Sequence, residues 1–177
     1  MPTEGMQVMI EEDRYKRQTL LWGGEGQTKL AESRVTVIGS DHQGAYLSLC
    51  LAALGVGNIV LLDGESSTNG SSFLGVNTPK GTRSESIAHV LRLVNPQISV
   101  EAYPTNLESR IDQDVLTGST VIIDTTNNVR SKELAIFFGR EKSIPVLSTS
   151  SKWGYTKLQL CDPSENDSSY VMPMFVG

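Results

Sequence analysis

Cysteine is scarce in this sequence, with only Cys50 and Cys161 among 177 residues. Two distant cysteines provide neither a disulfide framework nor a CxxC zinc-binding pair, so no zinc site is expected. Cys50 lies in the apolar run 47–51 and is predicted to be buried, where a thiol is unreactive. Asp162 follows Cys161, and its negative charge disfavours the thiolate. We therefore expect two reduced thiols and no catalytic cysteine.

The sequence also lacks an excess of basic residues and any long apolar run. Its 15 Lys and Arg residues face 20 Asp and Glu residues, which gives a net charge of −5. Nucleic acid is therefore not expected as a main partner. No run approaches the roughly 20 apolar residues that span a bilayer, and the acidic N-terminus has no signal pattern. These absences predict a soluble, cytoplasmic protein that does not associate with membranes.

Alternating apolar segments predict an α/β fold. Strands are predicted at residues 35–38, 59–62, 98–103, 120–123, 144–147 and 155–160, and helices at 45–54, 84–94, 106–116 and 129–142. Strands that alternate with helices form a Rossmann-like, doubly wound, mostly parallel sheet with helices on both faces.

The chain is predicted to form a single domain over residues 13–177, after a flexible N-terminus at residues 1–12. Asp13 is expected to cap a short helix that Gly23 and Gly24 then break. Residues 64–80 are predicted to form a loop. The apolar residues 171–177 are expected to pack on another surface or to continue into a longer chain.

The stretch from Ser33 to Glu65 has the layout of a nucleotide-binding βαβ unit. Gly39 and Gly44 occupy the outer positions of a G-x-G-x-x-G pattern, where glycine lets backbone N–H groups approach phosphate. Asp41 takes the middle position, where its charge opposes a polyanion by on the order of 1 kcal/mol or more. Asp63 is placed to bond ribose hydroxyls. The pattern alone fits a nucleotide site and a domain with a helix-capping loop equally well.

A second candidate segment, Asp124-Thr-Thr-Asn-Asn128, follows a predicted strand. Ligands of open α/β sheets bind at the carboxyl ends of strands, so this segment lies where a ligand is expected. Asn127 and Asn128 are poorer Mg²⁺ ligands than a carboxylate, and helix capping by either explains the segment equally well. His42 and His89 are isolated, and no metal site is predicted.

Several motifs, taken in order, resemble the ubiquitin-activating-enzyme-like family, which includes the ThiF, MoeB and HesA adenylating proteins. Arg14, Lys16 and Arg17 form a basic cluster near the start of the chain. Without this resemblance, the cluster is interpreted as part of a solvated amphipathic arm. The matching segments cover most of the chain and are Arg14-Tyr-Lys-Arg-Gln18, Leu-Trp-Gly23, Gly26-Gln27, Ser33 to Gly39, Leu54-Gly-Val-Gly57, Leu62-Asp63, Arg92-Leu-Val-Asn-Pro96, Ile144-Pro-Val-Leu147 and Gly154.

The resemblance implies a fold that binds ATP and Mg²⁺ and adenylates the C-terminal glycine of a ubiquitin-like or sulfur-carrier protein. The nucleotide-binding positions that it implies are Gly39, Asp41, Gly44, Asp63, Arg83 and Asn127. This sequence departs from the family at several of them. Asp41 replaces a glycine, Arg83 stands in place of a lysine with different geometry, and Asn127 stands in place of an aspartate. The family's arginine beyond Asp63 is missing from residues 64–74.

The resemblance also implies a homo- or heterodimer in which Arg17 reaches the phosphates of ATP in a partner subunit. A chain that combines an intact arm with an altered nucleotide loop resembles the non-catalytic subunit of heterodimeric activating enzymes. Our leading hypothesis is such a dimerising subunit, with an impaired ATP site of its own. The alternatives are an active adenylating enzyme and a non-enzymatic protein-binding scaffold. An NAD-dependent oxidoreductase is disfavoured because no catalytic constellation accompanies the βαβ unit.

Overall fold

The protein is described from a computed structural model that covers residues 14–67, 81–108, 111–152 and 155–163. Along the chain, its elements are α2 (Lys16–Glu32), β1 (Arg34–Ile38), α3 (His42–Leu54), β2 (Asn58–Leu62), α4 (Arg83–Val94), β3 (Ser99–Tyr103), the 3₁₀ helix η3 (Ile111–Leu116), β4 (Val121–Asp124), α5 (Val129–Lys142), β5 (Val146–Lys152) and β6 (Tyr155–Cys161). No helix among these residues is both long enough and apolar enough to cross a membrane.

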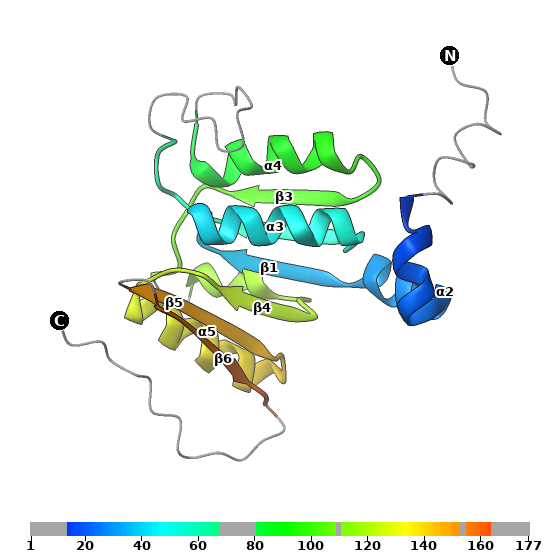
Figure 1. The fold of residues 1–177 in the computed structure, drawn as a ribbon. Coiled ribbons are helices and arrows are strands. Elements are labelled where there is room, and N and C mark those ends of the chain that lie inside the picture. The colour runs from blue at the N-terminus through cyan, green and yellow to red at the C-terminus, as the bar shows by residue number, and fades with distance from the viewer. Residues whose placement is uncertain (1–13, 68–80, 109–110, 153–154, 164–177) are drawn as a thin grey trace.

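The strands form one six-stranded sheet in the order β3-β2-β1-β4-β5-β6. The first five strands are parallel, and β6 runs antiparallel along β5. Helices α3 and α4 cover one face of the sheet and α5 covers the other (Figure 1). The Rossmann-like, mostly parallel sheet with helices on both faces is thereby confirmed.

Each face of the sheet has its own apolar core. Val37, Leu61 and Leu91 belong to the core under α3 and α4, and they are at most 1% exposed. Ile122 and Leu116 belong to the core under α5 and are fully buried. Residues alternate between these two cores along each central strand, so β1, β2 and β4 are apolar on both sides, as the continuous apolar runs indicate.

Several details differ from the sequence-based predictions. The strand predicted at 144–147 lies at Val146–Lys152. The helix predicted at 106–116 is wrong, because within the described part of that segment only the 3₁₀ helix Ile111–Leu116 forms. The helix predicted from residue 45 begins at His42, because Asp41 caps it. Cys50 is exposed rather than buried, whereas Cys161 is buried. The predictions for Asp13, residues 171–177 and most of the 64–80 loop fall outside the described residues.

Helix α2 forms an arm at the end of the sheet opposite the carboxyl ends of the parallel strands (Figure 1). Gly23, at φ 72° and ψ 177°, breaks its helical geometry, as the glycine pair predicts. The side-chain amides of Gln18 and Gln27 both donate to the Leu54 carbonyl, at 2.7 and 3.1 Å. These bonds satisfy a carbonyl that the C-terminus of α3 leaves unpaired.

A second set of contacts joins the arm to the end of α4. The buried Asn95 side chain donates to the Tyr15 hydroxyl at 2.7 Å and to the Ala52 carbonyl at 2.8 Å. Two glycines allow the close approach: a Cβ on Gly55 would lie 2.6 Å from the Tyr15 ring, and one on Gly57 would lie 1.7 Å from the Ala31 carbonyl oxygen. The three motifs around residues 14–18, 54–57 and 92–96 therefore meet in one packed junction, which we call the arm junction.

Candidate functional site: a pocket at the carboxyl ends of the strands

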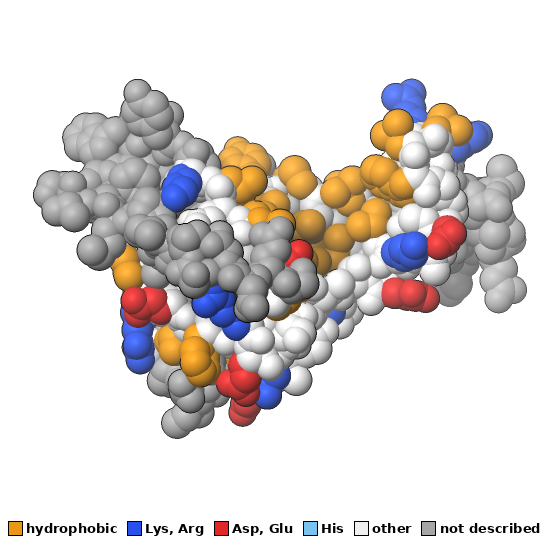
Figure 2. All heavy atoms as spheres, turned by 90° about the horizontal axis from the view of Figure 1, so that it is seen from below, with side chains coloured by type: hydrophobic (Ala, Val, Ile, Leu, Met, Phe, Trp, Pro, Cys, Tyr) orange, Lys and Arg blue, Asp and Glu red, His pale blue; other side chains and the backbone are white. Residues whose placement is uncertain are grey.

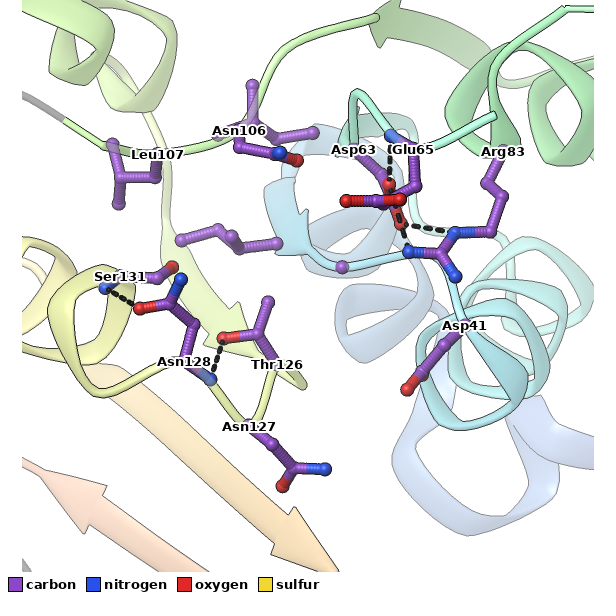
Figure 3. A pocket seen from close by; sticks show the side chains of 13 residues that line it. Asp41, Asp63, Glu65, Arg83, Asn106, Leu107, Thr126, Asn127, Asn128 and Ser131 are labelled. Carbon is purple, nitrogen blue, oxygen red and sulfur yellow. Dashed lines mark hydrogen bonds and ion pairs between the residues drawn. The ribbon is translucent and has the colours of Figure 1, made fainter. Parts of the chain in front are cut away.

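A pocket of about 500 Å³ lies where β1, β2 and β4 end, a volume in the range of small-molecule sites. Apolar side chains and polar groups from the flanking loops and helices share its wall (Figure 3). The lining residues are Ile38, Gly39, Asp41, Leu62, Asp63, Glu65, Arg83, Asn106, Leu107, Thr126, Asn127, Asn128 and Ser131.

Gly39 and Gly44 shape the turn between β1 and α3. Gly39 has a backbone φ of +89°, which residues other than glycine rarely adopt, and its N–H donates to the Leu62 carbonyl at 2.9 Å. A Cβ on Gly44 would lie 1.9 Å from the Gly39 carbonyl oxygen. Both glycines are therefore required by the backbone of the turn itself. Gly44 is buried beside the pocket and does not line it.

Asp41 caps the N-terminus of α3. Its Oδ1 accepts hydrogen bonds from the backbone N–H groups of Gln43 at 3.1 Å and Gly44 at 3.4 Å. These N–H groups carry the positive end of the helix dipole, which is what a phosphate at this position would use. In this chain a carboxylate of the protein already occupies that position. Asp41 is thus both the cap of α3 and the residue that replaces the middle glycine of the motif.

Asp63 lies at the end of β2 with 2% of its surface exposed. Its Oδ2 accepts from the Ser40 N–H at 2.6 Å and its Oδ1 from the Glu65 N–H at 2.9 Å. The Arg83 guanidinium also donates to it, from Nε to Oδ2 at 3.1 Å and from Nη2 to Oδ1 at 3.4 Å. Arg83 therefore lies over the carboxylate (Figure 3). A ligand that bonds Asp63 has to displace or share this bidentate pair.

The segment after β4 forms the opposite wall. Asn128 caps α5, since its Oδ1 accepts from the N–H groups of Arg130 at 2.9 Å and Ser131 at 3.2 Å. The capping interpretation of this segment is therefore confirmed for Asn128. Asn127 is exposed and lines the pocket without being the cap. Its side chain is an uncharged amide at the edge of the cavity (Figure 3).

Beneath this wall lies a buried ion pair that sequence reasoning missed. Lys132 Nζ donates to Asp124 Oδ1 at 3.1 Å and to the Thr149 carbonyl at 2.7 Å. The other Asp124 oxygen accepts from the Ser131 hydroxyl at 2.9 Å, and Asp124 itself is fully buried. The sequence does contain one indication of this pair: Asp124 ends a strand, and Lys132 lies in the first turn of the next helix.

The structure thus brings Gly39, Asp41, Asp63, Arg83 and Asn127 together around one pocket. Arg17 is not among them: it is exposed on α2, at the other end of the sheet (Figure 1). An action of Arg17 on a nucleotide site therefore requires a second subunit.

Among the described lining residues of the pocket, carboxylates outnumber cations. Arg83 is neutralised by Asp63, which leaves Asp41 and Glu65 as further carboxylates on the lining. Asn127 adds an uncharged amide to the lining, a weaker ligand for a divalent cation than a carboxylate. Within the part of the chain that the structure describes, no three His, Cys, Asp or Glu side chains gather to hold a metal ion.

Comparisons with known proteins place this geometry in context. The model of the ThiF family matches residues 15–171. The SAMP-activating enzyme E1 of Haloferax volcanii is 33% identical over 141 residues, which cover 76% of this chain and 52% of the relative. SUMO-activating enzyme subunit 1 of Xenopus laevis is 34% identical over 125 residues, 67% of this chain and 36% of the relative. The chain therefore spans about half or less of the length of these relatives.

A solved structure shares the fold. E. coli MccB, determined together with AMPCPP and MccA, superposes with a TM-score of 0.75 at 20% identity. The superposition covers 86% of this chain and 49% of MccB. At this level of identity the likeness concerns the fold of the chain.

Proposed function

The chain belongs to the ThiF family, and from this premise we propose that it is a dimerising subunit of an activating enzyme, with little ATP turnover of its own. In this role it supplies Arg17 to the nucleotide site of a partner subunit. The observation that carries the proposal is the Asp41 carboxylate on the N-terminal N–H groups of α3. The substrate of the assembled enzyme is the C-terminus of a ubiquitin-like or sulfur-carrier protein, as the names of the relatives support.

Asp41 acts against phosphate in two ways. Its side chain takes the two N–H donors at the start of α3, so a phosphate has to compete for them. If a phosphate displaces the Asp41 carboxylate from these N–H groups, the carboxylate still lies within a few ångströms of the phosphate. Repulsion between two such like charges costs roughly 1 kcal/mol in water and several times more when the pair is partly shielded from solvent. The helix dipole that favours an anion here is therefore already satisfied.

The remaining phosphate and metal positions reinforce this effect. Among the described residues that line the pocket, Arg83 is the only cation, and its guanidinium is held by Asp63. Asn127 offers no negative charge to Mg²⁺. ATP and Mg²⁺ are thus the cofactors of the family site, and the residues present in this chain do not fit them well. We derive no reaction step at this pocket.

The arm supports the second half of the proposal. Tyr15 and Gln18 are used inside the chain, in bonds to Asn95 and Leu54. Arg17, on the same helix, is exposed. The arm is thereby fixed to its own subunit through two residues of the motif and presents the arginine to solvent, as donation to another subunit requires.

Titration of the purified chain with ATP–Mg²⁺ tests the first half. We expect no heat of binding at micromolar ATP, and clear micromolar binding would sink the proposal.

A reconstituted pair tests the second half. With a catalytic ThiF-family subunit and its carrier protein, Arg17→Ala should lower carrier-dependent pyrophosphate exchange by at least about 100-fold, the effect of losing a transition-state cation. Lys16→Ala, the neighbouring exposed cation, is the matched control and should leave the rate nearly unchanged. Equal rates for both variants would contradict a role for Arg17.

One observation favours a second candidate, an enzyme that still adenylates its carrier protein. The pocket remains open at about 500 Å³, and the turn of Gly39 and Gly44 keeps the backbone of a nucleotide loop. In that case Arg83 exchanges Asp63 for a phosphate when ATP binds. The ATP titration separates the two candidates, because only the second predicts micromolar binding by the lone chain.

A further inference from the structure

The pocket at the carboxyl ends of the strands has a negative lining. Its described lining residues include three carboxylates, on Asp41, Asp63 and Glu65, and one cation, Arg83, which together give a net charge of −2. A cavity of about 500 Å³ at this edge of an open α/β sheet is where a small-molecule ligand is expected. The sign of the lining charge therefore bears on the ligand that the cavity takes.

Asp63 and Arg83 neutralise each other and are not the source of this charge. The Asp63 carboxylate accepts four hydrogen bonds, from the backbone N–H groups of Ser40 and Glu65 and twice from the Arg83 guanidinium. A carboxylate offers about four lone-pair sites, so these bonds use its capacity. Neither member of the pair presents an unpaired charge to a ligand.

Asp41 and Glu65 supply the unpaired negative charge. Within the described part of the chain, no Lys, Arg or His side chain lies within ion-pair distance of either carboxylate. The two hydrogen bonds that Asp41 accepts from α3 involve only its Oδ1 and come from uncharged backbone groups. The Glu65 side chain is exposed. A ligand with a positive charge finds two carboxylates here that no described cation neutralises.

Other glutamates of this protein have a cation beside them. Glu25 pairs with Lys29 and Glu141 with Lys142, each at an N–O distance of 2.9 Å. Figure 2 shows acidic and basic side chains intermixed on one face of the molecule. The pocket has the opposite arrangement, because its one described cation is already bound to Asp63 while two further carboxylates stay unpaired.

The charged and the uncharged groups lie on different sides of the cavity (Figure 3). Asp41 and Glu65 lie on the side of β2 and α3, whereas Leu107, Asn127 and Asn128 lie on the opposite side. A ligand that matches both sides has a positive group at one end. Its other end is an uncharged body, with apolar surface for the leucine and polar atoms for the amides.

We propose that the pocket binds a small organic cation, in which an ammonium or guanidinium group is attached to an apolar body of one or two rings. The positive group faces Asp41 and Glu65, and the body lies against Leu107. The inference rests on the proposed function in one respect, since it takes the pocket to be left open by ATP. The charge that disfavours the phosphates of ATP is the charge that attracts this cation.

A bare metal ion suits the pocket less well. Mg²⁺ and Ca²⁺ take six or more oxygen ligands at short distances, whereas no three His, Cys, Asp or Glu side chains of the described residues gather to hold one. Much of the cavity wall is apolar, and Ile38, Leu62 and Leu107 belong to it. Such a wall favours a ligand with apolar surface of its own.

A set of three indoles tests the order of charge. Tryptamine, tryptophol and indolepropionate share one ring system and carry a positive, no and a negative charge. In titrations of the isotope-labelled full-length chain followed by amide NMR, tryptamine should bind at least about tenfold more tightly than tryptophol, and indolepropionate most weakly. Shifts of the Gly39 and Glu65 amides locate the site. Raising the ionic strength from about 0.01 M to about 0.1 M should narrow the difference, because the Debye length falls from roughly 30 to 10 Å.

Removing one carboxylate at a time identifies the residues that attract the cation. Asp41→Asn and Glu65→Gln should each weaken the binding of tryptamine by about fivefold and leave that of tryptophol unchanged. Glu32→Gln is the matched control, since Glu32 is exposed at the other end of the sheet and loses the same charge. It should change the affinity for tryptamine by less than about twofold at the higher ionic strength.

Equal affinities for the three indoles, or an equal loss of tryptamine binding in Glu32→Gln, would overturn the inference. So would a Mg²⁺ titration that shifts the same amides and displaces tryptamine, because the carboxylates then hold a metal ion. Micromolar binding of ATP by the unaltered chain would instead overturn the proposed function. The order of the three indoles, measured without ATP, would still decide the present inference.

Discussion

The two ends of the parallel sheet are built on opposite principles. At the amino end, the arm junction brings three motifs together through direct packing, and glycines at 55 and 57 leave no room for even one extra methyl group. At the carboxyl end, a pocket of about 500 Å³ stays open, and two of its charged side chains, Asp63 and Arg83, bind each other. The amino end therefore constrains sequence through close packing, whereas the open pocket leaves the side chains that line it room to change.

The largest effect should follow from removing Lys132, under the pocket wall. Lys132→Met keeps most of the side-chain volume but leaves the fully buried Asp124 without its cation. Loss of one partner of a buried pair costs about 3–5 kcal/mol. Urea denaturation should show this loss, while Lys142→Met, in an exposed pair, should change stability by under about 0.5 kcal/mol. A small effect at both sites would mean that the buried pair of Asp124 and Lys132 does not stabilise the carboxyl end.

The arm junction should be broken next most severely by Gly57→Ala. The added Cβ would lie 1.7 Å from a backbone oxygen of Ala31, so α2 has to move away from β2. We expect a destabilisation of about 2–3 kcal/mol in urea denaturation. Gly24→Ala is the matched control: its Cβ meets nothing within 4 Å, and alanine should stabilise the helix by roughly 0.5–1 kcal/mol. A similar change in unfolding free energy for both substitutions would mean that close packing does not constrain the amino end.

At the carboxyl end, Asp41→Asn should change ligand affinity rather than stability. Asparagine caps a helix about as well as aspartate, so the unfolding free energy should stay within about 0.5 kcal/mol. Removing the charge should raise the affinity for ATP–Mg²⁺ about tenfold, or roughly 1.4 kcal/mol. Calorimetric titration measures this, with the exposed Asp114→Asn as control. Unchanged affinity would show that Asp41 is not what opposes phosphate.

The smallest effect concerns acid stability. Hydrogen bonds from Arg34, and next from Tyr103, hold the pKa of Glu101 below its ordinary value. The folded state therefore binds this proton less readily than the unfolded state. The stabilisation is complete above the unfolded pKa of about 4.3 and is lost as the pH falls through the lower folded pKa.

Glu101→Gln should accordingly flatten the decline of stability below about pH 4.5, by up to roughly 1 kcal/mol for this partly exposed pair. Denaturation midpoints at several pH values measure the slope, with the exposed Glu133→Gln as control. An unchanged slope would mean that the bond across β2 carries no acid sensitivity.

The sheet and most helices were predictable because their apolar residues follow a simple period. Strands at 35–38 and 59–62, and the helix predicted at 84–94, agree with β1, β2 and α4 within one residue. The predicted helix at 106–116 failed because its apolar residues serve different purposes. Leu107 lines the pocket and Leu116 belongs to the core under α5, while the Asn106 side chain accepts from the Gly64 N–H at 3.0 Å. A local pattern does not reveal such distant partners.

The candidate site was predictable in its members and less so in its bonds. Position within the βαβ unit indicates Asp41 and Asp63, and the family resemblance adds Arg83; the pocket contains all three. The pairing of Asp63 with Arg83 depends on how α4 approaches β2, which is a tertiary property. The exposure of Cys50 was missed for a related reason, since an apolar helix was assumed to be buried on every side.

The strand order described above also sets the order in which the protein can be completed during synthesis. β1 lies between β2 and β4, although β4 comes after β2, α4 and β3 in the chain. A nascent chain can therefore pair β1 with β2 early, but the other edge of β1 stays open until Val121–Asp124 has left the ribosome. An unpaired edge of Val and Ile residues is a site for wrong pairing. β1, a central strand of the finished sheet, is thus an exposed edge strand in the partly synthesised protein.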